Sequence, residues 1–450
     1  MLEKDAVLQG SANQSDYGDD WDYWHVVQGV GVTDSGILAP EEHIGSISGG
    51  TIKGPMWQMI GAFPPPNFSK GYAHKPWQCP SKGGCGDGRP KNLAFIDAID
   101  ITVQGINIID SSDWTQLFRR CHNVLEDHVR VLGDVHWGNN DGLDVESGSN
   151  LTFSNSIYST GDDCLAFRSG HCNPVRTPWP LRPPLYQFEP LTDVSVFNMT
   201  LTSSSAAIKV EALFQKNHGN VSNLRFHDIR IVKSNRGIGI WQRNGNGTMT
   251  GLSFTNMAIE TNRVPMAEFW GSGEPIVVTS IPSPCTEPPL FPLKGIHGVS
   301  FAGVTAVSEG GALFAVRGQP EASHLTKVAL DNVSITIAKL TAVAGPGLHD
   351  YRPEYPGCTP DTVVAPVDGI YVENVAELSL RDVAVSFRGP PQPRWSMQCL
   401  VSTPHSRIRG DLVRCANSSK PVGRIAGGAA TANYAAPPGR SGGGVTDGAP

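Results

Sequence analysis

Three aspartates in the first half of the chain have the residue type and spacing of a carboxylate-based catalytic site. Asp141 lies in the segment NNDG, and Asp162 and Asp163 lie in the segment GDDC. If the 21 residues from Asp141 to Asp162 make one turn of a solenoid, these two lie on neighbouring strands, about 5 Å apart. Carboxylates this close raise one another's pKa, so one can stay protonated while another is ionised. Such a set can supply the acid and base of a glycosidase, or the residues can simply form turns.

The strands that would position these aspartates come from an internal repeat. Four alternating apolar residues, interrupted by Asn, Asp or Gly, recur mostly every 23 to 30 residues, as in Leu151–Tyr158, Val194–Leu201 and Leu224–Ile231. Alternation with a period of two predicts strands, and a repeat of this length predicts a solenoid. A leucine-rich repeat is disfavoured because no helical stretch follows each strand, and a β-sandwich predicts no such register.

A second set of short apolar segments lies between these strands. Its members are Gly142–Val145, Cys164–Phe167, Ala207–Val210 and Gly237–Trp241. Two or more strands per turn, wound into parallel sheets, predict an all-β, right-handed parallel β-helix, a single-stranded solenoid. We expect one catalytic domain over residues 1–425, followed by a low-complexity, disordered tail over residues 426–450.

Strand alternation divides the side chains of this second set between two sides. Four share one parity, and we expect them to stack inside the solenoid, rung on rung: Leu143, Leu165, Ile208 and Ile238. Six are expected to face outward and to contact substrate: Asp144, Arg168, Lys209, Glu211, Trp241 and Arg243.

The outward set favours an acidic ligand. Arg168, Lys209 and Arg243 would form a column of cations along a cleft that also carries the aspartates, as binding a chain of uronate carboxylates requires. The same three residues could instead be ordinary solvated charges. The aromatic candidates are either sugar-stacking platforms or residues that pack loops: His136 with Trp137, Trp241 and Trp270.

Composition narrows the class of protein. The 450 residues include 50 Gly and 35 Pro but only 17% charged residues, which favours many short strands joined by turns. The net charge of −7 disfavours nucleic acid and anionic membranes as partners, and no apolar stretch is long enough to span a membrane. We expect a monomer whose partner is its substrate.

The cysteines and asparagines point to the secretory route. Nine cysteines show no CxxC pair and no His-rich metal spacing, so we expect disulfides rather than a metal site, and no cofactor. Eight Asn-x-Ser/Thr sequons are typical of a glycosylated protein that is secreted, extracellular or in a cell wall. The first residues, MLEKDAVLQGS, do not form a basic-then-apolar leader.

The aspartate segments resemble those of glycoside hydrolase family 28, the polygalacturonases and their relatives. The resemblance runs from about Ile44 to Asp382, and residues 139–170 are similar to the family's Asn-Thr-Asp and Gly-Asp-Asp segments at the family's spacing. SGGTIKGPMW (residues 48–57) is similar to a glycine-rich segment of the family. LEKDAVLQGS is similar to a strand that a leader-bearing segment precedes in the family, so we expect an N-terminal part to be missing.

The resemblance implies a reaction and a division of roles. It implies an inverting hydrolase of a pectin-like, acidic plant-type cell-wall polysaccharide. Asp162 would be the general acid, and Asp141 and Asp163 would orient and deprotonate water. For inversion we expect the acid and base carboxyls to lie roughly 6.5–9.5 Å apart.

Two segments depart from the family's pattern. SSSAAIKVE (residues 203–211) stands where Gly-His-Gly is expected, and GIGIWQR (residues 237–243) stands where Arg-Ile-Lys is expected. Both are similar to a divergent branch of the family, in which Lys209 and Arg243 could supply replacement cations. Polygalacturonan, rhamnogalacturonan and xylogalacturonan remain candidate substrates. A Ca²⁺-dependent polysaccharide lyase and a non-catalytic wall-binding protein remain alternative functions on the same fold.

Overall fold

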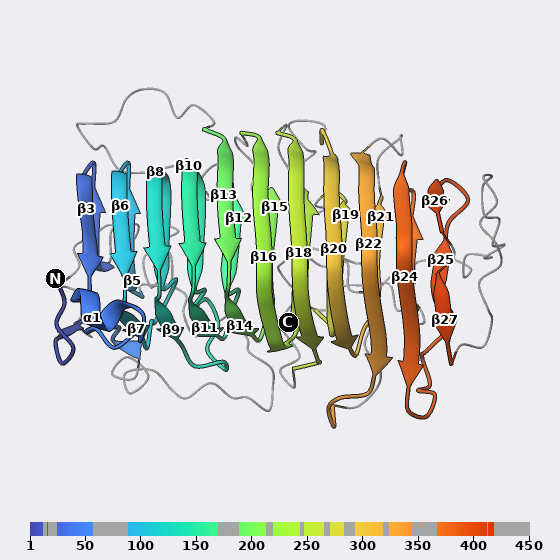
Figure 1. Ribbon diagram of the computed structural model, residues 1–450, viewed down its shortest axis with the longest axis horizontal. Coiled ribbons are helices and arrows are strands. Elements are labelled where there is room, and N and C mark those ends of the chain that lie inside the picture. Colours follow the sequence, from blue (N-terminus) through green and yellow to red (C-terminus); the bar gives the residue numbers. More distant parts are fainter. Residues whose placement is uncertain are drawn as a thin grey trace, which may run out of the picture.

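The computed structural model shows a long solenoid of strands (Figure 1). It describes residues 1–11, 16, 25–56, 89–169, 189–212, 219–243, 247–264, 271–282, 293–317, 324–343, 349, 367–411 and 413–417. The tail expected over residues 426–450 lies outside these residues, as does Trp270. Within the described part of the chain the helix is α1 (Glu41–Ile44), and no helix there is long and apolar enough to cross a membrane.

The strands stack into three sheets, numbered here sheet 1 to sheet 3. Sheet 1 contains β2 (His25–Val30), β5 (Lys91–Ile96), the first parts of β8 (Gln116–Asp127) and β10 (Leu143–Ser154), β12 (Leu165–Arg168), β15 (Ala206–Ala212), β17 (Arg236–Gln242), β19 (Glu274–Ser280), β21 (Ala312–Val316), β23 (Ile370–Glu373) and β25 (Leu400–Ser402). Sheet 2 contains β3 (Thr33–Leu38), β6 (Ile99–Gln104), the later parts of β8 and β10, β13 (Leu191–Phe197), β16 (Val221–Ser234), β18 (Met249–Thr261), β20 (Ile296–Ser308), β22 (Leu325–Ala338), β24 (Leu378–Arg388) and β26 (Ile408–Gly410). Sheet 3 contains β1 (Val7–Gln9), β4 (Thr51–Lys53), β7 (Asn107–Ile109), β9 (Arg130–Leu132), β11 (Ile157–Thr160), β14 (Thr200–Ser203) and β27 (Arg414–Ala416), with the ends of the long sheet 2 strands between β14 and β27.

All pairings between the described strands are parallel, and the strands of sheet 2 follow one another along the long axis from β3 to β26 (Figure 1). The fold is therefore the right-handed parallel β-helix predicted from the repeat, with the handedness that parallel crossovers almost always have.

The predicted apolar ladder is confirmed. Leu143 pairs with Leu165, Leu165 with Ile208, and Ile208 with Ile238. All four side chains are 0% exposed and belong to one core that runs through the solenoid. Because each rung buries its apolar side chains only against its neighbours, the alternation read from the sequence determines which side chains of sheet 1 face out.

The polar residue at the centre of each repeat marks the corner between sheets 2 and 3. Asn155, Asn198, Asp228 and Asn256 all have φ between 52° and 57°, the left-handed region that Asn and Asp tolerate best. Their side chains also bond from rung to rung: the amide of Asn198 donates to Oδ1 of Asn155 at 2.7 Å. The repeat therefore encodes two strands and the bend between them.

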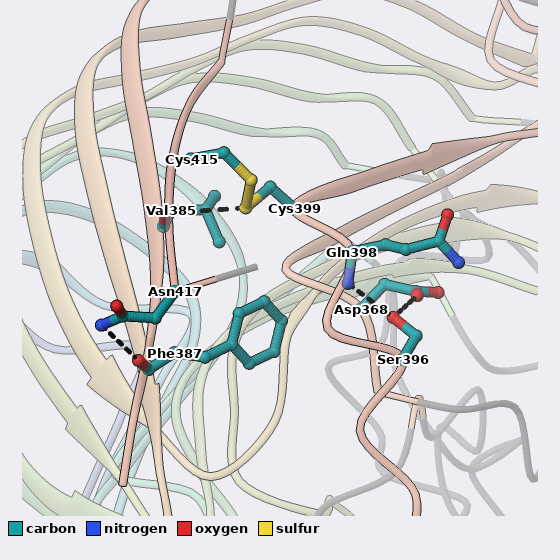
Figure 2. Close-up of a disulfide and its surroundings, with 8 residues drawn as sticks. All are labelled: Asp368, Val385, Phe387, Ser396, Gln398, Cys399, Cys415 and Asn417. Atoms are coloured by element: carbon teal, nitrogen blue, oxygen red, sulfur yellow. Dashed lines mark hydrogen bonds between the residues drawn. A yellow bond between two sulfur atoms is a disulfide. The ribbon is translucent and has the colours of Figure 1, made fainter. Parts of the chain in front are cut away.

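One of the expected disulfides lies at the C-terminal end of the solenoid. Cys399 and Cys415 are bonded, and Figure 2 shows Cys415 on the segment that leads to Asn417, whose amide donates to the Phe387 carbonyl at 3.1 Å. Closing a loop of about this length stabilises a fold by about 3 kcal/mol in the chain-entropy model. Cys121 and Cys164 are buried free thiols, and the other cysteines lie outside the described residues.

Candidate active site

Strand pairing brings the three aspartates together at the start of sheet 1. The pairing of Leu143 with Leu165 sets a register of 22 residues, and the amide of Gly142 donates to the Asp163 carbonyl at 2.8 Å. Asp141 therefore lies opposite Asp163, and Asp162 comes one residue before that register. The predicted proximity of Asp141 and Asp162 is confirmed, since their nearest oxygens lie within 4.8 Å of each other. Asp162 lies in the turn before β12, where the hydroxyl of Thr160 donates to its carbonyl at 2.6 Å.

The three carboxylates form one compact cluster. One oxygen from each of Asp141, Asp162 and Asp163 lies within 4.8 Å of the others. This distance joins single oxygens, so the 6.5–9.5 Å separation of whole carboxyl groups expected for an inverting pair stays a prediction. Oxygen ligands this close could also hold a divalent cation.

Asn140 ties the two aspartate turns together. Its side-chain oxygen accepts hydrogen bonds from the amides of Gly161 at 2.7 Å and Asp162 at 3.1 Å, and its amide donates to the Asp134 carbonyl at 3.0 Å. Gly161 is required here because a Cβ would lie 2.0 Å from the Trp137 carbonyl oxygen. Asn140 is fully buried, so the position of Asp162 depends on a side chain one residue away from Asp141.

Asp162 is the one partly exposed member of the cluster. Its carboxylate accepts hydrogen bonds from the amides of Asn139 and Asp163, each at 3.0 Å. Burial of its carboxyl and the charge of Asp163 raise the pKa of Asp162 to about 6, although Lys209 and the two amides act in the opposite direction. Asp162 is thus protonated in mildly acidic solution and accessible, as a proton donor must be.

Asp163 is in the opposite state. Burial by itself would raise the pKa of Asp163, but the ammonium of Lys209 at 2.8 Å lowers it below its ordinary value. The hydroxyl of Ser205 at 2.8 Å and the amide of Ala206 at 2.9 Å also donate to the carboxylate and lower the pKa. Asp163 is therefore an ionised carboxylate within the cluster.

Asp141 completes the cluster as a buried acid. Burial and then the charges of Asp144, Asp162 and Asp163 raise the pKa of Asp141 well above its ordinary range, while Lys209 lowers it. Asp141 therefore keeps its proton more readily than Asp163. A cluster with one ionised carboxylate beside protonated ones can give a proton and take one in the same reaction.

The outward side chains that were expected to contact substrate form a buried network of ion pairs. Arg168 contacts Asp144 at 2.5 Å and Glu211 at 2.9 Å, and Lys209 contacts Glu211 at 3.1 Å as well as Asp163. Arg168 and Lys209 therefore do not line an open cleft as solvated cations. Alternation correctly assigned their side of the sheet but could not show that carboxylates on the neighbouring rungs would pair with them.

The network continues beyond the predicted residues. Arg119 contacts Glu146 at 2.7 Å, and Glu146 lies between Arg119 and Arg168 in the strand register. Burial and Glu146 raise the pKa of Asp144 while Arg168 lowers it, and the pKa ends well above its ordinary value. Glu146 and Arg119 were missed in the sequence, although Glu146 has the same outward parity as Asp144. Ser205 and Asn140 were also missed. Their positions could have indicated them, because Ser205 lies in the segment that departs from the family's pattern and Asn140 directly precedes Asp141.

Trp241, also predicted to contact substrate, stands on the rung next to Glu211. Trp241 is 1% exposed and packs with Ala206 and Val277, and the Arg236 guanidinium lies 5.0 Å from its ring centre. It is therefore not an exposed platform: the missing side chain of Gly239 leaves room for the indole, and a Cβ there would lie 1.6 Å from the ring.

The other three side chains differ in exposure. Trp137 is also buried, and its indole N–H donates to the Ser112 carbonyl at 3.0 Å. Arg243 is buried, at the end of sheet 1. His136 has a 62% exposed side chain whose Nδ1 lies 3.0 Å from Asp134, so a role in substrate contact stays a prediction.

The segment that carries the cluster matches a known family. Residues 66–176 match the family described as Glycosyl hydrolases family 28. Over this segment the chain is similar to the polygalacturonases and their relatives. A polygalacturonase of Malus domestica is 33% identical over 86 residues, which are 19% of each chain. A probable polygalacturonase of Vitis vinifera is 24% identical over 253 residues, 56% of this chain and 47% of that one.

The similarity to these relatives covers only part of each chain. A putative galacturan 1,4-alpha-galacturonidase C of Aspergillus niger is 22% identical over 251 residues, 53% of each chain. The chain therefore spans between a fifth and about half of the length of the curated relatives that it matches. Among solved structures, a hyperthermoactive exopolygalacturonase from Thermotoga maritima superposes with a TM-score of 0.48 and 14% identity, covering 74% of each chain.

Proposed function

We propose that this chain belongs to glycoside hydrolase family 28 and is a glycoside hydrolase that cleaves O-glycosidic bonds of a pectin-type polysaccharide. The observation that carries the proposal is the opposite protonation of two adjacent carboxyls. Asp162 has a raised pKa and is partly exposed, whereas Lys209 keeps Asp163 ionised. The substrate class is supported by the relatives, whose names include polygalacturonase and galacturan 1,4-alpha-galacturonidase.

In the proposed reaction the aspartates take different roles. Asp162 donates its proton to the glycosidic oxygen as the bond from that oxygen to the anomeric carbon breaks. Asp163 takes a proton from the water molecule whose oxygen bonds to the anomeric carbon, and Asp141 binds the same water. The products are two shorter chains, one with a new reducing end, and solvent exchange returns a proton to Asp162 and removes one from Asp163.

A lyase on this fold is disfavoured by the state of Lys209. A lyase needs a base that removes a proton from the sugar ring, and Lys209 is the lysine beside the described cluster. Burial lowers its pKa, but Asp163 and Glu211 more than offset this effect and raise the pKa above its ordinary value. Lys209 therefore stays protonated and makes a poor base.

The deciding experiment is a reducing-sugar assay on a panel of polymers: polygalacturonan, rhamnogalacturonan, xylogalacturonan and methyl-esterified pectin. We expect new reducing ends without ultraviolet absorption, and loss of activity in Asp162→Asn. An absorbing, unsaturated product would establish a lyase instead. Binding of a polymer without any release of reducing ends would establish a wall-binding protein. Proton NMR of the first anomer formed decides between inversion and retention.

We also propose that the protein acts outside the cell, on or in a cell wall, as a monomeric glycoprotein. The disulfide between Cys399 and Cys415 fits an oxidising compartment, and the sequon asparagines Asn150, Asn198, Asn220 and Asn332 are exposed. Three measurements test the three parts of this proposal. Secretion from a eukaryotic host tests the location, a mobility shift on removal of N-linked glycans tests glycosylation, and size-exclusion chromatography tests the monomeric state.

A further inference from the structure

Trp114 lies directly beside the aspartate cluster. It precedes Thr115, whose amide donates to the Asp141 carbonyl at 2.7 Å, so it stands on the rung before Asp141. The other tryptophans in the described ranges, Trp137, Trp241 and Trp395, are buried, whereas Trp114 is partly exposed. Partial exposure of a large aromatic side chain beside reactive carboxyls is typical of a binding surface rather than of a core.

Two buried cations hold the Trp114 ring in place. The Arg168 guanidinium lies 4.9 Å from the ring centre and the Lys91 ammonium lies 5.4 Å from it. Both cations are anchored in turn, Arg168 by Asp144 at 2.5 Å and Lys91 by Asp113 at 3.0 Å. Cation–π contacts are stronger when the cation is desolvated, so the ring is pre-organised before substrate arrives.

The positively charged side chains around Trp114 form ion pairs with carboxylates of the protein itself. Arg168 and Lys91 each contact a carboxylate, and Lys209 contacts Asp163 and Glu211. A sugar ring placed here therefore meets an aromatic surface and an indole N–H more than it meets a free positive charge. Among the described residues, no hydrogen bond is made by that indole N–H, in contrast to the indole of Trp137.

We propose that Trp114 binds a pyranose unit of the polysaccharide next to the cleaved bond, on the side of the preceding rung. The ring of Trp114 packs against the apolar C–H face of the sugar, and its N–H donates to a sugar oxygen. Recognition at this subsite depends on stacking rather than on ion pairing, so binding there should depend little on salt. The inference rests on the proposed function, because it takes the substrate to be a polysaccharide.

The test measures binding without turnover. In the Asp162→Asn background, affinities for oligosaccharides from each polymer of the panel are measured by calorimetry for Trp114→Ala, Trp114→Phe and a matched control, Trp395→Phe. Trp395 is buried far from the cluster, its ring 5.7 Å from that of Phe387, so the control makes the same change at a structural tryptophan. Thermal unfolding of each variant confirms that it is folded.

We expect Trp114→Ala to weaken binding about tenfold to a hundredfold, which corresponds to roughly 1.4–2.8 kcal/mol. Trp114→Phe should weaken binding less, and Trp395→Phe should not change it. In the active enzyme, Trp114→Ala should act mainly by raising KM. Wild-type affinity in a folded Trp114→Ala, or a loss of affinity that disappears in high salt, would overturn the proposal.

The outcomes also separate this inference from the proposed function. If the wild-type protein cleaves no polymer but binding depends on Trp114, the hydrolase proposal fails and the subsite stands. If the wild-type protein cleaves a polymer and Trp114→Ala binds it normally, the subsite fails and the hydrolase proposal stands. If the Asp162→Asn protein binds no polymer of the panel, the subsite is rejected.

Discussion

The ammonium nitrogen of Lys209 lies 2.8 Å from Oδ2 of Asp163, and the two side chains are only 4% and 2% exposed. Lys209 stands in the segment that departs from the family's Gly-His-Gly pattern. The sequence suggested that it replaces a substrate contact. In the structure its positive charge is used inside the protein, where it keeps a carboxylate of the cluster ionised. In the proposed reaction Lys209 is therefore a positioning residue that acts through Asp163.

We expect Lys209→Met to change the pH dependence of the rate rather than substrate affinity. Without the ammonium, the pKa of Asp163 rises, so the fall in kcat/KM at low pH moves to higher pH. Loss of the base should lower kcat by about 10²–10⁴ at mildly acidic pH, with KM nearly unchanged. The measurement is a pH profile of kcat and KM.

Lys209→Arg, which retains the charge, is the matched control and should keep the acidic limb near its wild-type position. Removing one partner of a buried ion pair can cost about 3–5 kcal/mol of stability, so the unfolding temperature of each variant is recorded. A raised KM with an unchanged pH profile would show that Lys209 contacts substrate after all.

Asp162 should set the alkaline side of the same profile. Its pKa of about 6 means that the proton needed by the leaving oxygen is lost as pH rises through that value, so kcat/KM should fall above about pH 6. Asp162→Asn should lower kcat by about 10²–10⁴ while substrate binding is largely retained. A variant with a near-normal rate, or a wild-type profile flat to pH 8, would remove Asp162 from the role of acid.

The fold was predictable because the β-helix repeats one local rule. The ladder from Leu143 to Ile238 and the left-handed corner at Asn155 follow from alternation and from a polar residue at a fixed place in each repeat. Proximity of the three aspartates also followed, since stacking converts sequence spacing into distance.

The details of the site were not predictable from the same rule. Asp162 and Asp163 are adjacent, and the 22-residue register of Leu143 on Leu165 places Asp163, not Asp162, opposite Asp141. Alternation predicts whether a side chain points into the solenoid or out of it. Whether an outward side chain is exposed to solvent depends on which side chains stand on the neighbouring rungs. Glu211 pairs with Arg168, and Gly239 makes room for Trp241, through contacts between segments that are distant in sequence.

Asn140 should be a positioning residue whose loss lowers kcat more than it changes KM. Asn140→Ala removes the acceptor of the Gly161 and Asp162 amides, which leaves buried donors at a cost of about 1–3 kcal/mol each. A displaced Asp162 should lower kcat roughly a hundredfold, since small misplacements of a catalytic group have effects of that size. Kinetics at saturating substrate, with the unfolding temperature as a check, measure the effect.

Asn140→Asp is the companion variant. It retains an acceptor oxygen but adds a negative charge beside Asp162, which should raise the pKa of Asp162 and move the alkaline limb of kcat/KM to higher pH. A merely structural Asn140 would lower stability in both variants and leave that limb where it is in the wild type.

Glu126 is a carboxyl inside the solenoid rather than on its surface. It is fully buried at an inward position between Val103 and Phe153, and the hydroxyl of Tyr158 donates to its Oε1. Gln116 donates in turn to that hydroxyl at 2.7 Å. Burial raises the pKa of Glu126 from 4.5 to about 7, against the lowering effect of the hydrogen bonds.

Replacing Glu126 by Gln should therefore remove a pH-dependent loss of stability. Because the folded pKa lies above the unfolded one, the native state binds more protons between about pH 4.5 and 7, and stability falls as pH rises through that window. A shift of this size corresponds to about 3 kcal/mol.

Glu126→Gln keeps the acceptor for Tyr158 and cannot ionise. Its free energy of unfolding, relative to wild type, should rise by up to that amount between pH 4.5 and pH 8 in denaturant titrations. Glu309→Gln provides a control of opposite sign. Burial by itself would raise the pKa of Glu309, but hydrogen bonds to its carboxylate outweigh burial and lower the pKa, so its contribution to stability is lost as pH falls. A Glu126→Gln difference that does not change with pH would show that Glu126 stays protonated, or reaches water, throughout this range.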